Sequence, residues 1–310
     1  MLQTILGANG IIAKELATSL AEYPTEVRLV SRQPKPVLGH EQLQAADLLN
    51  ADQTNAAVSG SNIVYLTAGL HYNYKVWQQQ WPVVMQNTIN ACIQHQCKLV
   101  FFDNVYAFGA VQGAMTENTP YAAVSKKGIV RKQILQMIEK NVESGKLQAL
   151  VARAADFYGP GCTNSFLNMM VMQRHLKGQK AQWMLHTDKL HSFTYTPDAG
   201  KATALLGNTD TAYNQAWHLP TAAPALTAAD WMQRSATLTG APIGFQTLSL
   251  WMMKVLGVFI EPLRESIELS YQTNSDYIFD SSKFEKTFSV QPTDYDAGLA
   301  ATIASMSASK

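Results

Sequence analysis

The chain has 310 residues, 47% hydrophobic and 15% charged, a composition typical of a folded globular protein with an ample core. Its formal net charge of +1 at pH 7 gives no indication of a nucleic-acid or membrane-surface partner. Three cysteines do not make a disulfide framework, the start lacks the basic region of a signal peptide, and no apolar stretch is long enough to span a bilayer. We therefore expect a cytoplasmic protein that binds a small molecule.

The first predicted strand, residues 2–6, opens into a glycine turn and then into a helix that reaches about residue 22. Gly7 would provide the tight turn, Gly10 would let a pyrophosphate approach the backbone, and Ala13 is small enough for close packing of helix and strand. The helix N-terminus then offers unpaired N–H groups and a positive dipole end to phosphates. Strand, glycine turn and helix in this order predict a dinucleotide site rather than an ordinary turn, formed by Gly7, Ala8, Asn9, Gly10, Ile11 and Ile12.

The second predicted strand, residues 26–31, ends at the place where an NAD site has an acid that binds the ribose 2′-hydroxyl. No acid follows it. Arg32 and Lys35 are there instead, and a guanidinium suits a 2′-phosphate. The alternative is a solvated basic loop, but the pattern favours NADP(H) over NAD(H).

Further strands are predicted at residues 42–46, 62–67, 98–102 and 148–152, with helices between them at about 50–58, 71–96 and 124–143. Alternating strands and helices, with continuous apolar runs in the strands, predict an α/β fold with a doubly wound parallel Rossmann sheet. After residues 62–67, the small side chains of Thr67, Ala68 and Gly69 leave room for a ligand at the carboxyl edge of the sheet.

The later part of the chain predicts a smaller, mixed substrate domain. Helices are expected at about residues 164–177, 228–238 and 248–256, and a strand at 277–280. His191 is expected to lie at the surface or to pack. We assign residues 1–160 with about 192–220 to the Rossmann domain, and about 161–191 and 221–310 to the substrate domain.

Five stretches together resemble the extended, epimerase/dehydratase-like branch of the short-chain dehydrogenase/reductase superfamily. They are residues 7–13, Asp47-Leu48, Val105-Tyr106, the helix starting near Ser125, and Phe157-Tyr158-Gly159-Pro160. The similarity covers about residues 1–220. It implies that Asp47, Leu48 and Phe157 also contact the cofactor.

The catalytic pair of that family is Tyr-x-x-x-Lys, in which the tyrosine moves a proton to or from the substrate oxygen and the lysine lowers its pKa and holds the ribose. Here the helix reads Ser125-Lys126-Lys127-Gly128-Ile129-Val130-Arg131. Lys127 stands at the tyrosine position and Arg131 at the lysine position. The family's serine after the fifth strand is also missing, with Asp103 and Asn104 in that neighbourhood. The resemblance is therefore to an atypical member.

Three residues are candidate catalytic substitutes. Lys127 would hold the ribose, or act as an acid if burial lowers its pKa. Tyr106 would orient or protonate a substrate, and Asn104 would hydrogen-bond a carbonyl. The corresponding alternatives are a solvated lysine, a packing residue and a turn or cap residue. No metal ligand set is predicted, because Cys92, His95 and Cys97 sit where a helix end runs into a strand.

Two functions follow from the sequence. The first is an NADP(H)-dependent oxidoreductase or epimerase acting on a small carbonyl or hydroxyl compound, with a sugar nucleotide as one candidate. The second is a non-catalytic NADP(H)-binding redox sensor or regulator, which the missing tyrosine favours. The resemblance also implies a homodimer, in which the helices at about 71–96 and 124–143 pair across a two-fold axis.

Overall fold

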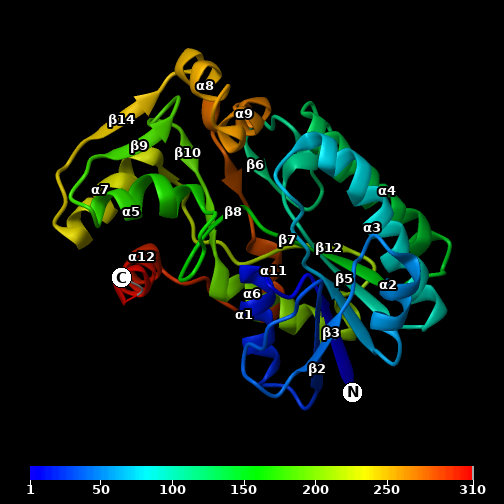
Figure 1. The fold of residues 1–310 in the computed structure, drawn as a ribbon. Coiled ribbons are helices and arrows are strands. Elements are labelled where there is room, and N and C mark those ends of the chain that lie inside the picture. The colour runs from blue at the N-terminus through cyan, green and yellow to red at the C-terminus, as the bar shows by residue number, and fades with distance from the viewer. Residues whose placement is uncertain (309–310) are drawn as a thin grey trace.

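The computed structural model describes residues 1–308. Seven parallel strands form one sheet in the order β12–β7–β5–β4–β1–β2–β3 (Figure 1). From β1 the chain winds first toward β3 and then, from β4 onward, toward β12, so the strand order reverses between β1 and β4. Ligands of doubly wound sheets bind at the carboxyl ends of the strands beside such a reversal. The strands are β1 (Leu2–Leu6), β2 (Glu26–Ser31), β3 (Gln42–Ala45), β4 (Ile63–Leu66), β5 (Lys98–Asp103), β7 (Ala149–Arg153) and β12 (Ala216–His218).

Helices cover both faces of this sheet, as expected because central strands such as β4 and β7 are buried along their whole length. One face packs on α1 (Ile11–Leu20) and α6 (Thr196–Gly207). The other packs on α2 (Ala51–Val58), α3 (Tyr74–Gln94) and α4 (Lys126–Glu143). The predicted doubly wound Rossmann fold is confirmed.

Individual residues explain how α6 packs on α1 and where α3 starts. Gly200 of α6 lies so close to α1 that a Cβ there would be 2.5 Å from the Cβ of Glu15, so α1 and α6 pack with their backbones nearly touching. Pro82 lies inside α3 rather than at its start, because Asn73 already caps the helix by accepting from the N–H groups of Lys75 and Val76.

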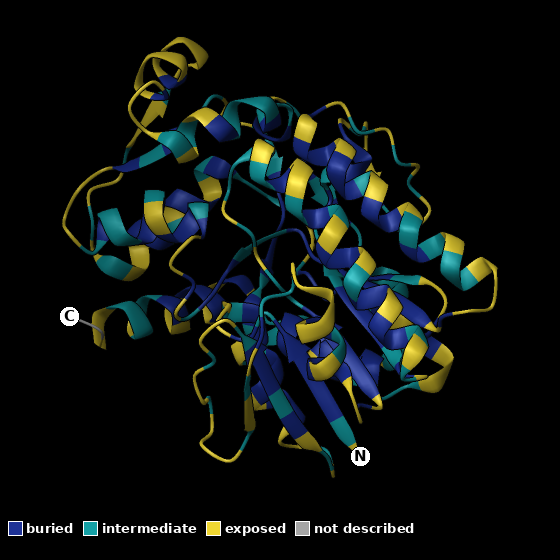
Figure 2. Ribbon diagram, turned by 45° about the vertical axis from the view of Figure 1, so that its right-hand side comes forward, coloured by how far each residue is buried: buried dark blue, intermediate teal, exposed yellow. Residues whose placement is uncertain are grey.

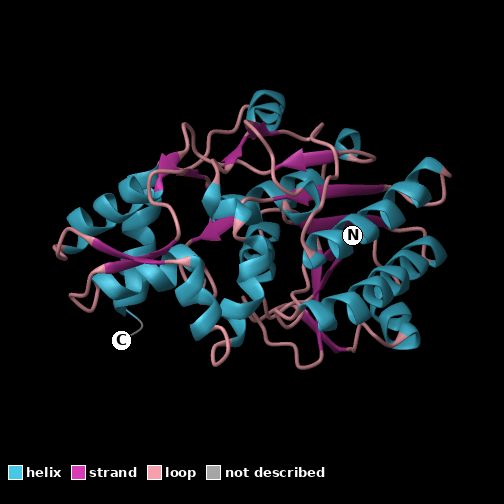
Figure 3. Cartoon of the chain, turned by 90° about the horizontal axis from the view of Figure 1, so that it is seen from above, coloured by secondary structure: helices cyan, strands magenta, loops and turns pink. Residues whose placement is uncertain are grey.

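The rest of the chain forms four pairs of short strands and a set of short helices beside the main sheet (Figure 3). The paired strands are β6 (Ala114–Met115) with β15 (Ile278–Phe279), β8 (Asp156–Tyr158) with β11 (Phe193–Tyr195), β9 (Ala181–Met184) with β14 (Phe245–Leu248), and β10 (Leu190–His191) with β13 (Leu226–Thr227). The helices are α5 (Gln173–His175), α7 (Ala228–Thr239), α8 (Leu250–Leu256), α9 (Glu261–Ser266), α10 (Tyr271–Asn274), α11 (Ser282–Phe288) and α12 (Tyr295–Ala308). Single turns are η1 (Tyr106–Phe108), η2 (Asn168–Met172), η3 (Asp210–Ala212) and η4 (Ile267–Leu269).

The helices expected in this second region are present. The helix expected over 164–177 runs without a break over residues 166–175, with a π-helical segment, η2, in its middle and α5 at its end. Asn168 anchors the π-helical segment, since its buried amide donates to the carbonyl oxygens of Gly159 and Cys162 and ties the helix to the preceding loop. Among the helices of residues 1–308, none is both long and apolar enough to cross a membrane.

Candidate functional site

The glycine turn after β1 is held between the ends of two neighbouring strands. The N–H groups of Gly7 and Ala8 both donate to the carbonyl oxygen of Val30 at the end of β2. Gly7 has a φ of +96°, and a Cβ there would lie 2.4 Å from the Cα of Ala68, beyond the end of β4. Only glycine fits this position, both for its backbone conformation and for the close approach.

The helix that follows this turn starts without a side-chain cap. Gly10 is its extended N-cap residue and offers no side-chain acceptor, whereas Asn50, Asn73 and Ser125 cap the starts of α2, α3 and α4. The first N–H groups of α1 are therefore left for another acceptor. An uncapped helix N-terminus behind a glycine turn fits a pyrophosphate.

Several other predicted cofactor residues lie around the same turn. Asn9 donates from Nδ2 to the carbonyl oxygen of Gln33, 2.9 Å away, which places the Arg32 loop beside the turn. The Arg32 side chain is exposed. A Cβ on Gly161 would lie 3.5 Å from the Cδ1 of Ile11, so the loop after Phe157 also reaches the start of α1.

The remaining predicted cofactor residues occupy neighbouring strand ends. Thr67, Ala68 and Gly69 follow β4, and the Thr67 N–H donates to the carbonyl oxygen of Leu6. Asp47 and Leu48 follow β3, where the half-buried Asp47 accepts from the N–H of Leu49. All these segments follow parallel strands of one sheet, so they lie along one edge.

In the first turn of α4, Lys127 is completely buried, so it is not a solvated lysine. Its Nζ donates to Glu265 Oε2 at 2.7 Å, to the carbonyl oxygen of Glu265 at 2.9 Å and to Glu268 Oε1 at 2.9 Å. It also lies 4.6 Å from the centre of the Tyr72 ring. These three acceptors use all the N–H bonds of a lysine ammonium.

The carboxylates come from a segment that also covers two helix starts. Glu265 accepts from the N–H of Tyr74 at the start of α3, and Glu268 accepts from the N–H of Lys126 at the start of α4. Glu261 accepts from Asn73 Nδ2 at 2.7 Å. Residues 261–268 thus fasten the second region of the chain over α3 and α4.

Arg131, which the sequence predicts at the family's lysine position, is also engaged in close contacts. Its Nη2 lies 2.8 Å from Asp103 Oδ1, and Arg153 Nε binds the second oxygen of the same carboxylate at 3.2 Å. The guanidinium lies 4.6 Å from the centre of the Trp81 ring. Burial lowers the pKa of Arg131 from its usual value, although the adjacent Asp103 opposes this change. This Arg–Asp–Arg cluster is buried between β5, β7 and α4.

The other two candidate catalytic residues directly follow β5. Asn104 Oδ1 accepts from the N–H of Tyr106, the turn contact weighed as its alternative role. The Tyr106 and Tyr72 hydroxyls are hydrogen-bonded to each other, and burial raises the pKa of both phenols. They therefore stay protonated at neutral pH and are hydrogen-bond donors, not bases.

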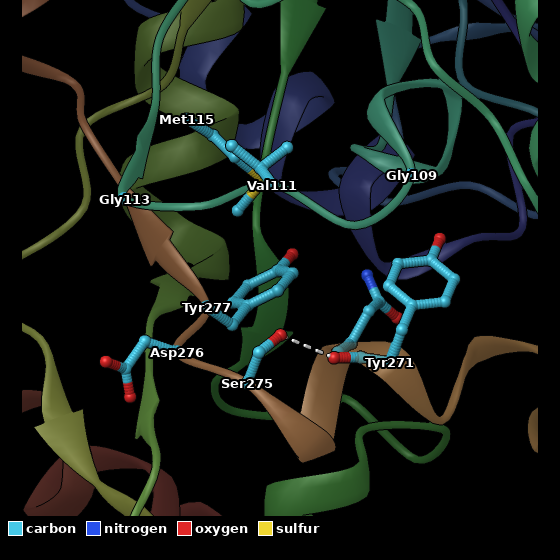
Figure 4. Close-up of a pocket in the computed structure, with 9 residues that line it drawn as sticks. Gly109, Val111, Gly113, Met115, Tyr271, Ser275, Asp276 and Tyr277 are labelled. Carbon is cyan, nitrogen blue, oxygen red and sulfur yellow. Dashed lines mark hydrogen bonds between the residues drawn. The ribbon is translucent and has the colours of Figure 1, made fainter.

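Sequence reasoning missed an acid–imidazole pair beside these phenols. Asp156, at the start of β8, is hydrogen-bonded to His191 across 3.0 Å between Oδ2 and Nε2. The His191 ring stacks on Tyr277 at 4.4 Å, and Tyr277 also lines a pocket with Tyr271 and Met115 (Figure 4). The Asp156 side chain is 32% exposed, so its carboxylate is reachable from solvent.

The signals for the missed residues differ. Asp156 directly precedes the recognised Phe157-Tyr158-Gly159-Pro160 stretch and was available as an acid near a strand end. Glu261, Glu265 and Glu268 share one helix face at spacings of four and three, but nothing in the sequence connects that face with Lys127. Within residues 1–308, no group of three or more metal-binding side chains comes together.

Comparisons with solved structures give the same fold over the whole chain. UDP-glucose 4-epimerase from Thermotoga maritima, solved with UDP-glucose, has a TM-score of 0.82 at 14% identity and covers 100% of this chain and 99% of its own. UDP-glucose 4-epimerase from Thermus thermophilus, solved with NAD, has a TM-score of 0.81 at 15% identity, with 100% of both chains covered. dTDP-glucose 4,6-dehydratase from Bacillus anthracis, also with NAD, has a TM-score of 0.82 at 13% identity, covering 100% of this chain and 97% of its own.

Comparison with curated proteins finds no matching sequence. A family model does match, over residues 4–216, and it describes the NAD dependent epimerase/dehydratase family. The matched region includes the glycine turn and the Asp156 turn, and it reaches into all seven strands of the main sheet. The expected membership of the extended short-chain dehydrogenase/reductase superfamily is confirmed, and the chain belongs to the NAD dependent epimerase/dehydratase family.

Proposed function

We propose that this protein is an NAD(P)(H)-dependent oxidoreductase or epimerase that acts on a small carbonyl or hydroxyl compound. One observation carries the proposal: the uncapped start of α1 lies on the same sheet edge as the partly exposed Asp156 carboxylate. A dinucleotide site and a proton acceptor at one edge are what such a reaction needs. Sugar nucleotides are the leading substrate class, because structural relatives were solved with UDP-glucose.

The residues at this edge fit a dinucleotide. The N–H groups at the start of α1 would bind the pyrophosphate, and Arg32 would reach the adenosine ribose or its 2′-phosphate. When bound, the nicotinamide supplies hydride transfer. Tyr106 would donate to the Tyr72 hydroxyl and Tyr72 to a substrate oxygen, and Asp156 would take up or return the proton of that oxygen.

A second function is favoured by the ion pairs of the two residues predicted at the family's catalytic positions. Lys127 and Arg131 are both buried in ion pairs, and this supports a cofactor-binding regulator that senses the NADPH/NADP ratio without turnover. The enzyme then depends on proton transfer by Asp156 and the polar groups around it, which a sensor would not need.

One experiment separates the two. Purified protein is titrated calorimetrically with the oxidised and reduced forms of both cofactors. Turnover is then followed as oxidation of NADPH or NADH with small carbonyl compounds, and as formation of the epimer by product analysis with sugar nucleotides. Binding with turnover supports the enzyme, binding without turnover of any panel member supports the sensor, and no binding of either cofactor contradicts both.

Three further expectations belong to this proposal. NADP(H) is preferred over NAD(H), because Arg32 is exposed and no acid follows β2. The three cysteines are free and buried, which suits the reducing cytoplasm. A homodimer through α3 and α4 remains predicted, although the apolar residues of these helices are largely used in the chain's own core. Light scattering over a concentration series tests it.

A further inference from the structure

One segment of the second region, residues 241–260, exposes more large apolar side chains than any other described segment. Helix α8 and the loop to Ile260 stand out at the top of the molecule, and this apolar tip is defined as residues 250–260 (Figures 1 and 2). Trp251 is 72% exposed, Val258 is 70% and Phe259 is 85%. Adjacent exposed apolar side chains of this size mark an interaction surface.

The charge of this tip indicates which kind of surface it contacts. Across residues 241–260 the only charged side chain is Lys254, which is exposed. Lys180 is also exposed and lies beside the start of this segment. Its Cε is 3.8 Å from the position that a Cβ on Gly244 would take. Residues 241–260 therefore combine exposed apolar side chains with a positive charge, and they contain no carboxylate.

A second copy of the chain is a poor occupant for this tip. A two-fold contact centred on the tip would bring Lys254 close to the Lys254 of the partner, and the next acid, Glu261, is already bound to Asn73 and His71. An anionic phospholipid surface complements both features, because its headgroups attract the lysines and its acyl boundary takes up the apolar side chains. Tryptophan, as at position 251, is a residue typical of this boundary.

The tip is also firmly attached to the rest of the molecule. Helix α9 begins directly after it at Glu261, and Glu261 and Glu265 are bound to Asn73 and Tyr74 at the start of α3. Inserting the tip would thus hold the whole molecule, including the sheet edge, at a fixed orientation to the surface.

We propose that residues 250–260 insert into the headgroup region of an anionic membrane and bind the protein peripherally to it. The near-neutral net charge of the whole chain gave the opposite expectation, because it averages over this local patch. The proposal is independent of turnover and of cofactor choice.

The test is sedimentation of the full chain with vesicles of phosphatidylcholine mixed with phosphatidylglycerol, and with vesicles of phosphatidylcholine alone. We expect binding to the mixed vesicles, weakened by high salt. The double substitution Trp251→Ser with Phe259→Ser should reduce it by at least about tenfold, since it removes two large apolar groups. Lys254→Glu should reduce binding to the anionic vesicles by about fivefold or more.

The matched control is Val124→Ser with Ile129→Ser, which removes two exposed apolar side chains, 67% and 55% exposed, outside the tip. It should bind vesicles as the wild type does. The proposal is overturned if the wild type does not sediment with anionic vesicles, or if the tip variant still binds like the control. It is also overturned if light scattering shows a concentration-dependent dimer that the tip substitutions abolish, because the tip would then be a self-association surface.

Discussion

Helix α1 begins with no side-chain cap, whereas α4 begins under the carboxylate of Glu268 and beside that of Glu265. The start of α1, the open end, keeps its backbone donors available. The start of α4, the closed end, has its cation, Lys127, bonded to three acceptors of the same chain. The strands of the main sheet that precede these helices, β1 and β5, are separated only by β4, yet one helix start is open to a ligand and the other is filled.

This difference is what we expect if the two halves of the family's site change independently. Phosphate binding depends on backbone geometry, such as the positive φ of Gly7, and survives extensive change of side chains. Proton transfer depends on particular side chains, and the sequence predicts Lys127 and Arg131 at the positions of the family's tyrosine and lysine. Proton transfer at this edge would then have to use other side chains, and the partly exposed carboxylate of Asp156 is one candidate.

The largest effect is expected from Gly7→Ala at the open end. The new Cβ would lie 2.4 Å from the Cα of Ala68, which is backbone and cannot move aside cheaply. We expect dinucleotide affinity to fall more than about 100-fold and the free energy of unfolding to fall by about 4 kcal/mol. Calorimetric titration and denaturant unfolding measure the two.

Gly60→Ala is the control for this substitution. Gly60 also has a positive φ, +76°, but a Cβ there would meet nothing within 4 Å. It should cost only about 1 kcal/mol for the left-handed conformation. Equal losses for the two variants would mean that the close approach to Ala68 has no special role.

Lys127→Met at the closed end is expected to have the next largest effect. It leaves the buried Glu265 carboxylate without its cation, so the free energy of unfolding should fall by about 3 kcal/mol. Lys126→Met, at the exposed neighbouring position, is the control. If Lys127→Met instead keeps wild-type stability and selectively weakens cofactor binding, Lys127 holds the cofactor and the ion pairs are secondary.

The sequence predicted the open end of the site well and the closed end poorly. The glycine turn, the strands and the carboxyl-edge residues are local patterns, and the structure brings residues 7–12 and 67–69 together at one edge as expected. The contact of Lys127 with Glu265 spans 138 residues, and no local period records such a pairing. Asp156 and His191 are likewise 35 residues apart and meet only through the packing of β8 with its neighbours.

Arg32→Ala returns to the open end, with a smaller effect confined to the cofactor. Losing one charge-assisted contact should weaken NADP(H) binding by about 10- to 100-fold, or about 1.5–3 kcal/mol. NAD(H) has no 2′-phosphate, so its affinity should hardly change. Calorimetric titration with both cofactors is decisive, and equal losses for the two would contradict a preference based on Arg32.

The smallest predicted effect concerns His218, at the end of β12 on the same edge as the closed site. Its Nδ1 donates to the carbonyl oxygen of Asp280 at 2.9 Å, because a carbonyl oxygen only accepts. Its Nε2 is buried without a hydrogen-bond partner among the described residues, and the ring stacks on Phe279 at 4.1 Å. Burial, followed by the nearby Arg153, lowers the pKa of His218 well below its usual value.

The direction of the pH effect follows from this lowered pKa. Below about pH 6.5 the unfolded chain takes up a proton at this histidine and the folded chain does not, so stability is complete above that pH and is lost as pH falls. Each unit by which the folded pKa is lowered accounts for about 1.4 kcal/mol. Denaturant unfolding of the wild type and of His218→Phe between pH 5 and 7.5 measures the slope, with His40→Phe at an exposed position as the control. If His218→Phe loses stability with the same slope as the wild type below pH 6.5, then His218 takes up its proton in the folded state, and the closed end of the edge admits charge more readily than its burial implies.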